Sequence, residues 1–227
     1  MEHLPWFVAA AFSIVFLLAV WLFSKAAHFS KWPLTVILLF TVIQSVLGLA
    51  GFYDNPDSLT FRFPLLVFPL LIFGIFMFIT RKGRDFIDSL DIATLTFMHV
   101  IRVGVELVLF WLYAQKTIPQ AMTLEGRNFD ILSGLTAPLV YYFGFVKGRL
   151  SRRVMVIWNI ACILLLLNVV SSAFLSLPGR YLKFGFEQPN IAVGFFPFLL
   201  LPAIIVPLVL FSHAATIRQL VLNNQKK

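Results

Sequence analysis

Three ionisable side chains occur at a regular spacing within one apolar run of the sequence. His99, Arg102 and Glu106 occupy positions i, i+3 and i+7 of this run. On an α-helix, which turns about 100° per residue, these positions fall within about 60° of one face. A guanidinium donates hydrogen bonds, a carboxylate accepts them, and an imidazole can do both. The spacing therefore predicts a polar stripe that can bind a small polar or anionic ligand.

The composition of the whole chain says where this stripe must lie. The 227 residues are 60% hydrophobic and only 12% charged, with a mean hydropathy of +0.92. Soluble domains carry about 45–50% apolar and about 25% charged residues, and disordered chains are still more polar. The composition excludes both classes and predicts an integral membrane protein. The net charge of +8 does not indicate a nucleic-acid partner, because Lys and Arg stand in short connections between apolar runs.

Seven continuous apolar runs predict an all-α bundle of seven transmembrane helices in a single polytopic domain over 1–227. A helix needs about 20 apolar residues to cross the hydrocarbon core, and the fifth run is short, with a polar start. The last residues, 212–227, are predicted to form a short cytoplasmic tail that begins as a helix. The predicted spans are 4–23, 33–53, 63–80, 92–114, 129–146, 154–175 and 191–211.

The basic residues predict the orientation. The first, third and fifth connections and the tail hold twelve Lys and Arg, whereas the N-terminus and the other connections hold five. Lys and Arg in short loops mark the cytoplasmic side. We therefore expect an outside N-terminus and a cytoplasmic C-terminus, in a plasma membrane or a bacterial inner membrane.

A charged stripe inside a span must avoid the lipid. Arg or Glu near the bilayer centre costs at least about 2.5–3.5 kcal/mol each, even on insertion scales. Arg102 and Glu106 should therefore face protein or water inside the bundle. At i and i+4 they can also pair with each other. Two interpretations stay open: a neutral pair that only holds helices together, or a hydrated pocket for a ligand.

Other polar residues are candidates for the same pocket because the topology places them in the outer half of the bundle or in its interior. Arg127 and Asp130 stand where the chain enters the fifth run, and Asn168 is near the outer end of the sixth. The candidate ligand-binding residues are Arg102, Glu106, His99, Tyr113, Asp130, Arg127, Asn168 and Gln44.

Two intramembrane histidines raise the question of a cofactor. His99 and His213 lie at similar depth on the inner side, so they can approach one another. A catalytic zinc takes three protein ligands, and the third would have to be a carboxylate such as Glu106 or Asp130. Two histidines facing each other could instead hold haem. The sequence therefore identifies weak metal-ligand candidates, and the cofactor stays unknown.

The leading functional hypothesis is a bundle that binds, senses or transports a small polar or anionic ligand in its charged interior. Pro197, Pro202 and Pro207 favour a bent last span beside that interior, because each removes a backbone donor. One alternative is a membrane-embedded enzyme for a lipid or lipid-linked substrate, dependent on a metal or haem. The other is a scaffold or accessory subunit. The expected partners are the lipid bilayer and a small-molecule or lipid ligand, with a protein partner left open.

Overall fold

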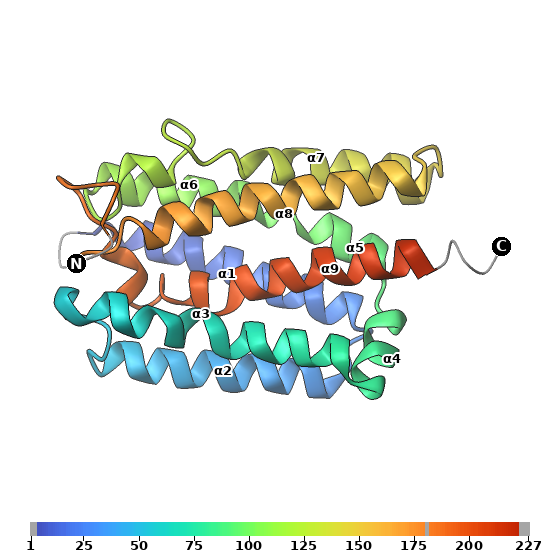
Figure 1. The fold of residues 1–227 in the computed structure, drawn as a ribbon, viewed down its shortest axis with the longest axis horizontal. Helices are drawn as coiled ribbons and strands as arrows, with labels where there is room; N and C mark the ends of the chain where they lie inside the picture. The colour runs from blue at the N-terminus through green and yellow to red at the C-terminus, as the bar shows by residue number, and fades with distance from the viewer. Residues whose placement is uncertain (1–3, 180–181, 223–227) are drawn as a thin grey trace.

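The computed structural model describes residues 4–179 and 182–222. Within these ranges the fold is all-helical, without β-strands. The long helices run side by side along one axis and form a single bundle (Figure 1). The α-helices are α1 (Trp6–Ala26), α2 (Lys31–Leu49), α3 (Pro56–Ile79), α4 (Arg81–Ser89), α5 (Ile92–Met98), α6 (Ile101–Ala114), α7 (Ile131–Tyr141), α8 (Arg152–Phe174) and α9 (Val206–Leu222).

Four short segments of other helical types complete the described chain. They are the 3-10 turns Gln120–Met122 and Ala192–Gly194 and the π-helical turns Tyr142–Val146 and Leu201–Ile205. The two π-helical turns extend α7 at its end and α9 at its start. Such turns are uncommon in α-helices, and the turn before α9 contains Pro202, which has no backbone N–H to donate.

Six helical segments of the described chain are long and apolar enough to cross a membrane, as expected for a multi-pass helical membrane protein. The segment Ile131–Val146, which matches the fifth predicted span, is apolar but shorter. The six are Trp6–Ala26, Lys31–Leu49, Ser58–Ile79, Ile92–Ala114, Arg152–Phe174 and Leu201–Leu222.

The last span lies further along the chain than the sequence pattern suggested. We expected 191–211, but the continuous helix runs from Leu201 to Leu222. Residues 191–200 are mostly non-helical, because the prolines at 197 and 202 interrupt the helical hydrogen bonds. Most of the predicted tail belongs to α9, where Ser212, His213 and Thr216 are fully buried by neighbouring helices. Residues 223–227 of that tail lie outside the described residues.

The connections alternate between the two ends of the bundle. The α1–α2 turn, α4, the α7–α8 connection and the end of α9 lie together at one end, opposite the start of α1 (Figure 1). This is the grouping on which the count of basic residues relied. At that end Arg218 of α9 pairs with Asp88 of α4, with Nη2 and Oδ2 2.9 Å apart. Which end faces the cytoplasm stays a prediction.

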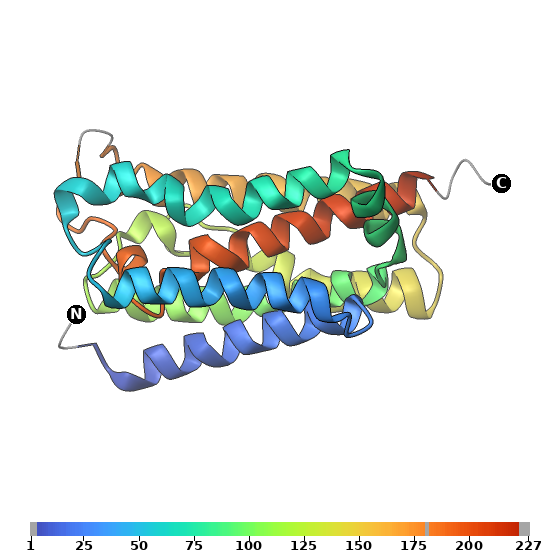
Figure 2. The same cartoon turned by 90° about the horizontal axis from the view of Figure 1, so that it is seen from below.

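Helix α9 occupies the middle of the bundle and contacts α3, α5 and α8. Figure 1 shows α9 between α8 and α3, and the perpendicular view in Figure 2 shows it set deeper than α3. Helix α1 packs against α5 and α6. A Cβ added at Gly104 would lie 2.6 Å from Val15 Cγ2, so the glycine permits close contact between α6 and α1. The residues of the polar stripe are thus enclosed by helices.

Candidate functional site

The predicted span 92–114 is interrupted within its polar stripe. Helix α5 ends at Met98, and α6 starts at Ile101. Across the break the backbone bonds are of the i to i+3 type, including Arg102 N–H to His99 O at 3.1 Å. A tight turn of this kind in the middle of a helix often marks a functional site or strain. His99 therefore lies on one side of the turn, and Arg102 and Glu106 lie on the other.

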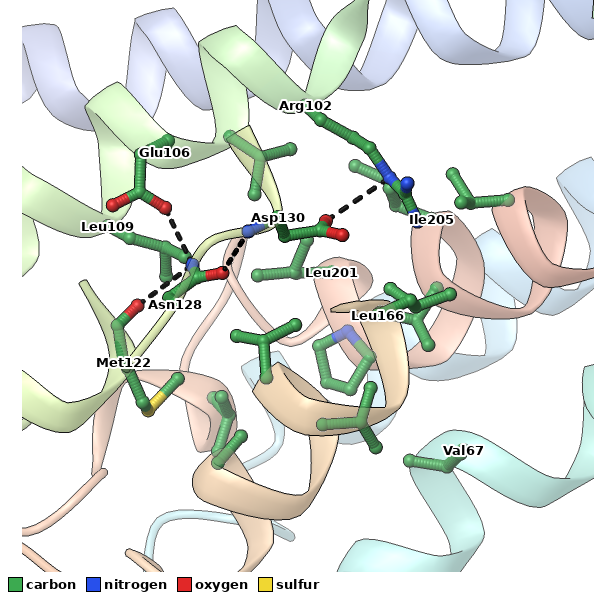
Figure 3. A pocket seen from close by; sticks show the side chains of 18 of the residues that line it. Val67, Arg102, Glu106, Leu109, Met122, Asn128, Asp130, Leu166, Leu201 and Ile205 are labelled. Carbon is green, nitrogen blue, oxygen red and sulfur yellow. Dashed lines mark hydrogen bonds and ion pairs between the residues drawn. The ribbon is translucent and has the colours of Figure 1, made fainter. Parts of the chain in front are cut away.

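Arg102 pairs with Asp130, the residue that immediately precedes α7. Arg102 Nε and Asp130 Oδ2 are 3.2 Å apart, and the two residues are only 3% and 8% exposed. Figure 3 shows the pair with both side chains at the wall of one pocket. The suggested pairing of Arg102 with Glu106 on the same helix is therefore replaced by a pairing between α6 and the start of α7.

Glu106 is held by the connection between α6 and α7. The Leu124 N–H donates to its Oε1, and Asn128 Nδ2 donates to its Oε2, each at 2.6 Å. Asn128 also donates to Met122 O at 3.1 Å and accepts from Asp130 N–H at 3.0 Å. Asn128 thus links the Glu106 carboxylate to the residue that pairs with Arg102 (Figure 3).

The connection that supplies these contacts folds back among the helices. Thr123 and Asn128 are almost completely buried, and Asn128 N–H and Gly126 N–H both donate to Thr123 O, at 3.1 and 2.9 Å. Non-helical backbone inside a membrane protein is tolerated where protein surrounds it. This segment can bring Asn128 and Asp130 to α6 because its backbone folds on itself at Gly126.

We expect Gly126→Ala to destabilise this connection and the site with it. A Cβ there would lie 2.1 Å from Gln120 O and 2.7 Å from Gln120 C, which are backbone atoms that cannot rotate away. Overpacking of this kind costs about 1–3 kcal/mol. Thermal unfolding of the detergent-solubilised protein measures the loss. Gly74→Ala is the control, since its Cβ would meet only Phe211 Cδ2, at 3.4 Å; equal stability of the two variants would contradict the explanation.

The cluster lines a narrow cavity of about 60 Å³, which has room for about four water molecules. Arg102, Glu106, Asn128 and Asp130 contribute its charged and amide groups, and the other lining residues are apolar. The apolar walls come mainly from α3, α6, α8 and the start of α9. A polar group placed here is therefore surrounded by hydrocarbon on most sides.

Apart from Arg102 Nε, which contacts Asp130 Oδ2, three polar atoms of the ion pair are left without hydrogen bonds. Arg102 Nη1 and Nη2 and Asp130 Oδ1 are buried and have no hydrogen-bonding partner within the described ranges. The Cys162 thiol lies close to the guanidinium, but a thiol is only a weak acceptor. Burying an unsatisfied donor or acceptor costs about 1–3 kcal/mol. The cavity thus presents unused donors beside an unused acceptor.

The residues of this cluster lie within the segment of the chain that matches a known protein family. A family model described as "Domain of unknown function (DUF8737)" matches residues 60–221. The chain belongs to this family. The matched segment runs from α3 into α9 and contains the ion pair, Glu106 and Asn128. No curated protein and no solved structure matches the chain.

The two predicted metal-ligand candidates lie in the same DUF8737 segment and stack on each other. The rings of His99 and His213 have centroids 3.7 Å apart and planes 5° apart, and both residues are 0% exposed. Asn159 Nδ2 donates to Met155 O at 2.8 Å, which turns its Oδ1 toward His213 Nδ1 at 2.7 Å. His213 therefore carries its proton on Nδ1 in this network.

The stacked arrangement does not resemble a metal site. The lone pairs of an imidazole lie in the ring plane, so two rings stacked face to face do not direct their nitrogens at one ion. Among the residues that the structure describes, no three His, Cys, Asp or Glu side chains are grouped to hold a metal. Both His99 ring nitrogens and His213 Nε2 lack hydrogen bonds there. The pair instead packs edge-on against Trp158, 5.9 and 5.7 Å from its ring.

Four other candidates lie away from the cavity. Asn168 Nδ2 donates to Arg127 O at 2.5 Å, and the Arg127 guanidinium lies over the Phe184 ring at 4.9 Å. Tyr113 borders a separate hollow between the α6–α7 connection and residues 183–188, and its backbone carbonyl accepts a hydrogen bond from Gln188. These residues connect loops rather than line the pocket.

Gln44, the fourth of these, joins α2 to α3 outside the DUF8737 match. Its Nε2 donates to Leu65 O at 2.9 Å, and its Oε1 accepts from the Tyr53 hydroxyl at 2.8 Å. Burial raises the pKa of Tyr53, with the charge of Arg62 acting in the opposite direction. The phenol therefore stays a proton donor at neutral pH.

Sequence reasoning missed three residues of the cluster. Asn128 belongs to the polar start of the fifth run and was not among the candidates, yet it bridges Glu106 and Asp130. Ser133 lies one helical turn after Asp130, buried beside Cys162 of α8. The only signal for Ser133 was its i+3 spacing from Asp130 on a helix, and a lone cysteine in an apolar run carries none.

Proposed function

We propose that this helical membrane protein binds a small polar group inside the bilayer, at the Arg102–Asp130 pair. The observation that carries the proposal is the set of unused atoms, Arg102 Nη1 and Nη2 and Asp130 Oδ1, at the wall of one cavity. A ligand with an acceptor next to a donor would satisfy both sides of the pair. The proposal retains the sequence-based hypothesis of a ligand pocket.

The charges of the cluster favour a neutral ligand over an anion. The guanidinium charge is already balanced by Asp130 at 3.2 Å. Glu106 adds a second carboxylate, whose two oxygens accept hydrogen bonds from Leu124 and Asn128. An added anion would face two carboxylates at short range in a medium of low dielectric constant. A carbonyl, amide or hydroxyl group avoids this repulsion.

We further propose seven crossings, with the N-terminus outside. The segment Ile131–Val146 is about 24 Å long at 1.5 Å per residue, which is less than the hydrocarbon core of about 30 Å. The buried connection before it, which includes Asn128, supplies the remaining length. Transporters build ligand sites near the midplane from interrupted helices of this type. The alternation of connections in Figure 1 supports the odd number of crossings.

Binding can be tested with three four-carbon probes whose polar ends are neutral, anionic and cationic: butyramide, butyrate and butylamine. We expect butyramide to raise the melting temperature of the purified protein most, because its amide both accepts and donates. At ten times the dissociation constant, linkage gives about 1.4 kcal/mol, or about 3–6 °C. Butylamine should have no effect beyond that of its ionic strength.

The matched control is the double variant Arg102→Met/Asp130→Leu, which replaces both polar partners with apolar side chains. Butyramide should not stabilise this variant. If butyramide leaves the melting temperature of the natural chain unchanged, or raises both proteins equally, the proposed site is wrong. If butyrate is the better probe, the neutral preference is wrong.

A further inference from the structure

Two hollows lie one after the other between α3 and α9, and the first is the cavity beside Arg102. Its walls near the cluster include Phe63 and Val67 of α3 and Val206 of α9. A second hollow, of about 310 Å³, lies one turn further along the same two helices. Gly74, Phe78, Leu210 and Ala214 are among its lining residues. We call these two hollows together the α3–α9 groove.

The floor of the groove is a partly exposed stripe of α9. Val206, Leu210 and Ala214 are spaced four apart, so they follow one face of the helix. All three are partly exposed, although most of their neighbours on α9 are buried. In Figures 1 and 2, α9 lies between α3 and α8 and deeper than α3. Val206 lines the cavity together with residues of α3 and α8, and Leu210 and Ala214 line the far hollow together with residues of α3.

Helices α3 and α8 contact each other near the start of α3 and the end of α8, and these contacts partly close the groove at that end. Phe63 of α3 and Phe174 of α8 have ring centroids 6.0 Å apart. The Thr60 hydroxyl also donates to Pro178 O, just beyond α8, at 2.6 Å. Further along, α3 and α8 each pack on α9. Between these contacts Val206, Leu210 and Ala214 stay partly exposed, so in a membrane the groove is open to the acyl chains of the bilayer.

The dimensions and chemistry of the groove fit one apolar chain with a polar end. From Pro202, at the cluster, to Ala214, at the far hollow, the continuous helical segment Leu201–Leu222 rises about 18 Å at about 1.5 Å per residue. This length exceeds half of a hydrocarbon core of about 30 Å. The polar atoms without partners stand at one end, and the lining toward the other end is apolar.

We propose that the occupant of the α3–α9 groove is a single-chain amphiphile that enters from the bilayer. Its neutral, oxygen-bearing head accepts from Arg102 and donates to Asp130, and its chain lies along α9. This inference rests on the proposed function, which it extends from a polar group to a lipid-soluble molecule. Bilayer chains are as apolar as the groove, so the head provides the selectivity.

The probe for the experiment is palmitamide, which carries the amide of butyramide on a sixteen-carbon chain. A photoreactive analogue with a diazirine in the middle of the chain is incorporated with the full-length protein into phosphatidylcholine nanodiscs. After illumination, we expect mass spectrometry to find label on groove residues of α3 and α9. Excess unmodified palmitamide should compete this labelling away.

Gly74→Phe tests the groove separately from the polar cluster, because Gly74 lines the far hollow and a bulky side chain there would obstruct it. We expect this variant to lower the competable labelling by at least about tenfold, as about 1.4 kcal/mol of lost binding would do. Its stabilisation by butyramide should stay unchanged. Ile14→Phe on the exposed face of α1, where Ile14 is 66% exposed, is the control and should label normally.

The outcomes separate the two proposals. If the label is spread over all lipid-facing helices and palmitamide does not compete, while butyramide still stabilises the protein, the amphiphile is wrong and the proposed function stands. The same holds if Gly74→Phe labels as the natural chain does. If butyramide also fails to act, both proposals fall. Competable labelling that persists in Arg102→Met/Asp130→Leu would contradict the assigned position of the head.

Discussion

Asp130→Ala is expected to lower the free energy of unfolding by about 3–5 kcal/mol, the usual cost of leaving one partner of a buried ion pair alone. The variant would keep the Arg102 guanidinium 3% exposed and without a counter-ion. The Cys162 thiol beside it cannot compensate a full charge. Unfolding of the detergent-solubilised protein, followed by circular dichroism, measures this change.

The double variant Arg102→Met/Asp130→Leu is the control for this prediction. Replacing a buried ion pair by apolar side chains of similar size is often neutral or stabilising. We expect the double variant to regain stability to within about 1 kcal/mol of the natural chain. A single Asp130→Ala variant as stable as the natural chain would show that the guanidinium reaches another acceptor or water. The buried ion pair would then not be the stabilising contact.

Glu106→Leu is the second change with a large expected effect. It removes the acceptor of both the Leu124 N–H and the Asn128 amide, which donate to the carboxylate at 2.6 Å. Each buried donor left unpaired costs about 1–3 kcal/mol, so we expect a total loss of about 2–6 kcal/mol in the unfolding free energy. Limited proteolysis between α6 and α7 should also become faster, because the connection loses its anchor.

Glu106→Gln separates the loss of acceptors from the loss of charge. Glutamine keeps one oxygen, but its amide nitrogen would face a second donor. Asn128 cannot simply rotate, since its Oδ1 accepts from Asp130 N–H at 3.0 Å. We therefore expect Glu106→Gln to be destabilised about half as much as Glu106→Leu. Equal stability of both variants and the natural chain would mean that Glu106 does not hold the connection.

The sequence predicted the helical membrane fold well because hydropathy and length are local properties. It also placed Arg102 and Glu106 away from lipid, and the structure buries both. The partner of Arg102 could not be predicted, because Asp130 reaches it through a folded connection that has no repeating pattern. The same limit applies to Asn128, whose role depends on the turn at Gly126.

The remaining differences between the predicted and observed helices concern the bounds of the last span and the turn after His99. The hydropathy pattern ended the last span before Ser212, whereas the helix continues to Leu222 because its polar residues are buried by neighbours. That helix starts only at Leu201 because the prolines at 197 and 202 interrupt the helical hydrogen bonds. The i to i+3 turn after His99 contains no Gly or Pro of its own, and Gly104 lies further along in α6, so no residue at the turn signalled it.

Asp130 comes later in the chain than the charged residues of α6, and this order affects how α5 and α6 insert into the membrane during synthesis. Arg102 and Glu106 are made before the connection that supplies Leu124, Asn128 and Asp130. While the ribosome is still completing that connection, α5 and α6 enter the membrane with two charges whose partners are missing. Each charge then carries an insertion cost of about 2.5–3.5 kcal/mol. This helix pair should therefore stay beside the translocon until α7 arrives, and truncation before Asp130 should leave it poorly inserted.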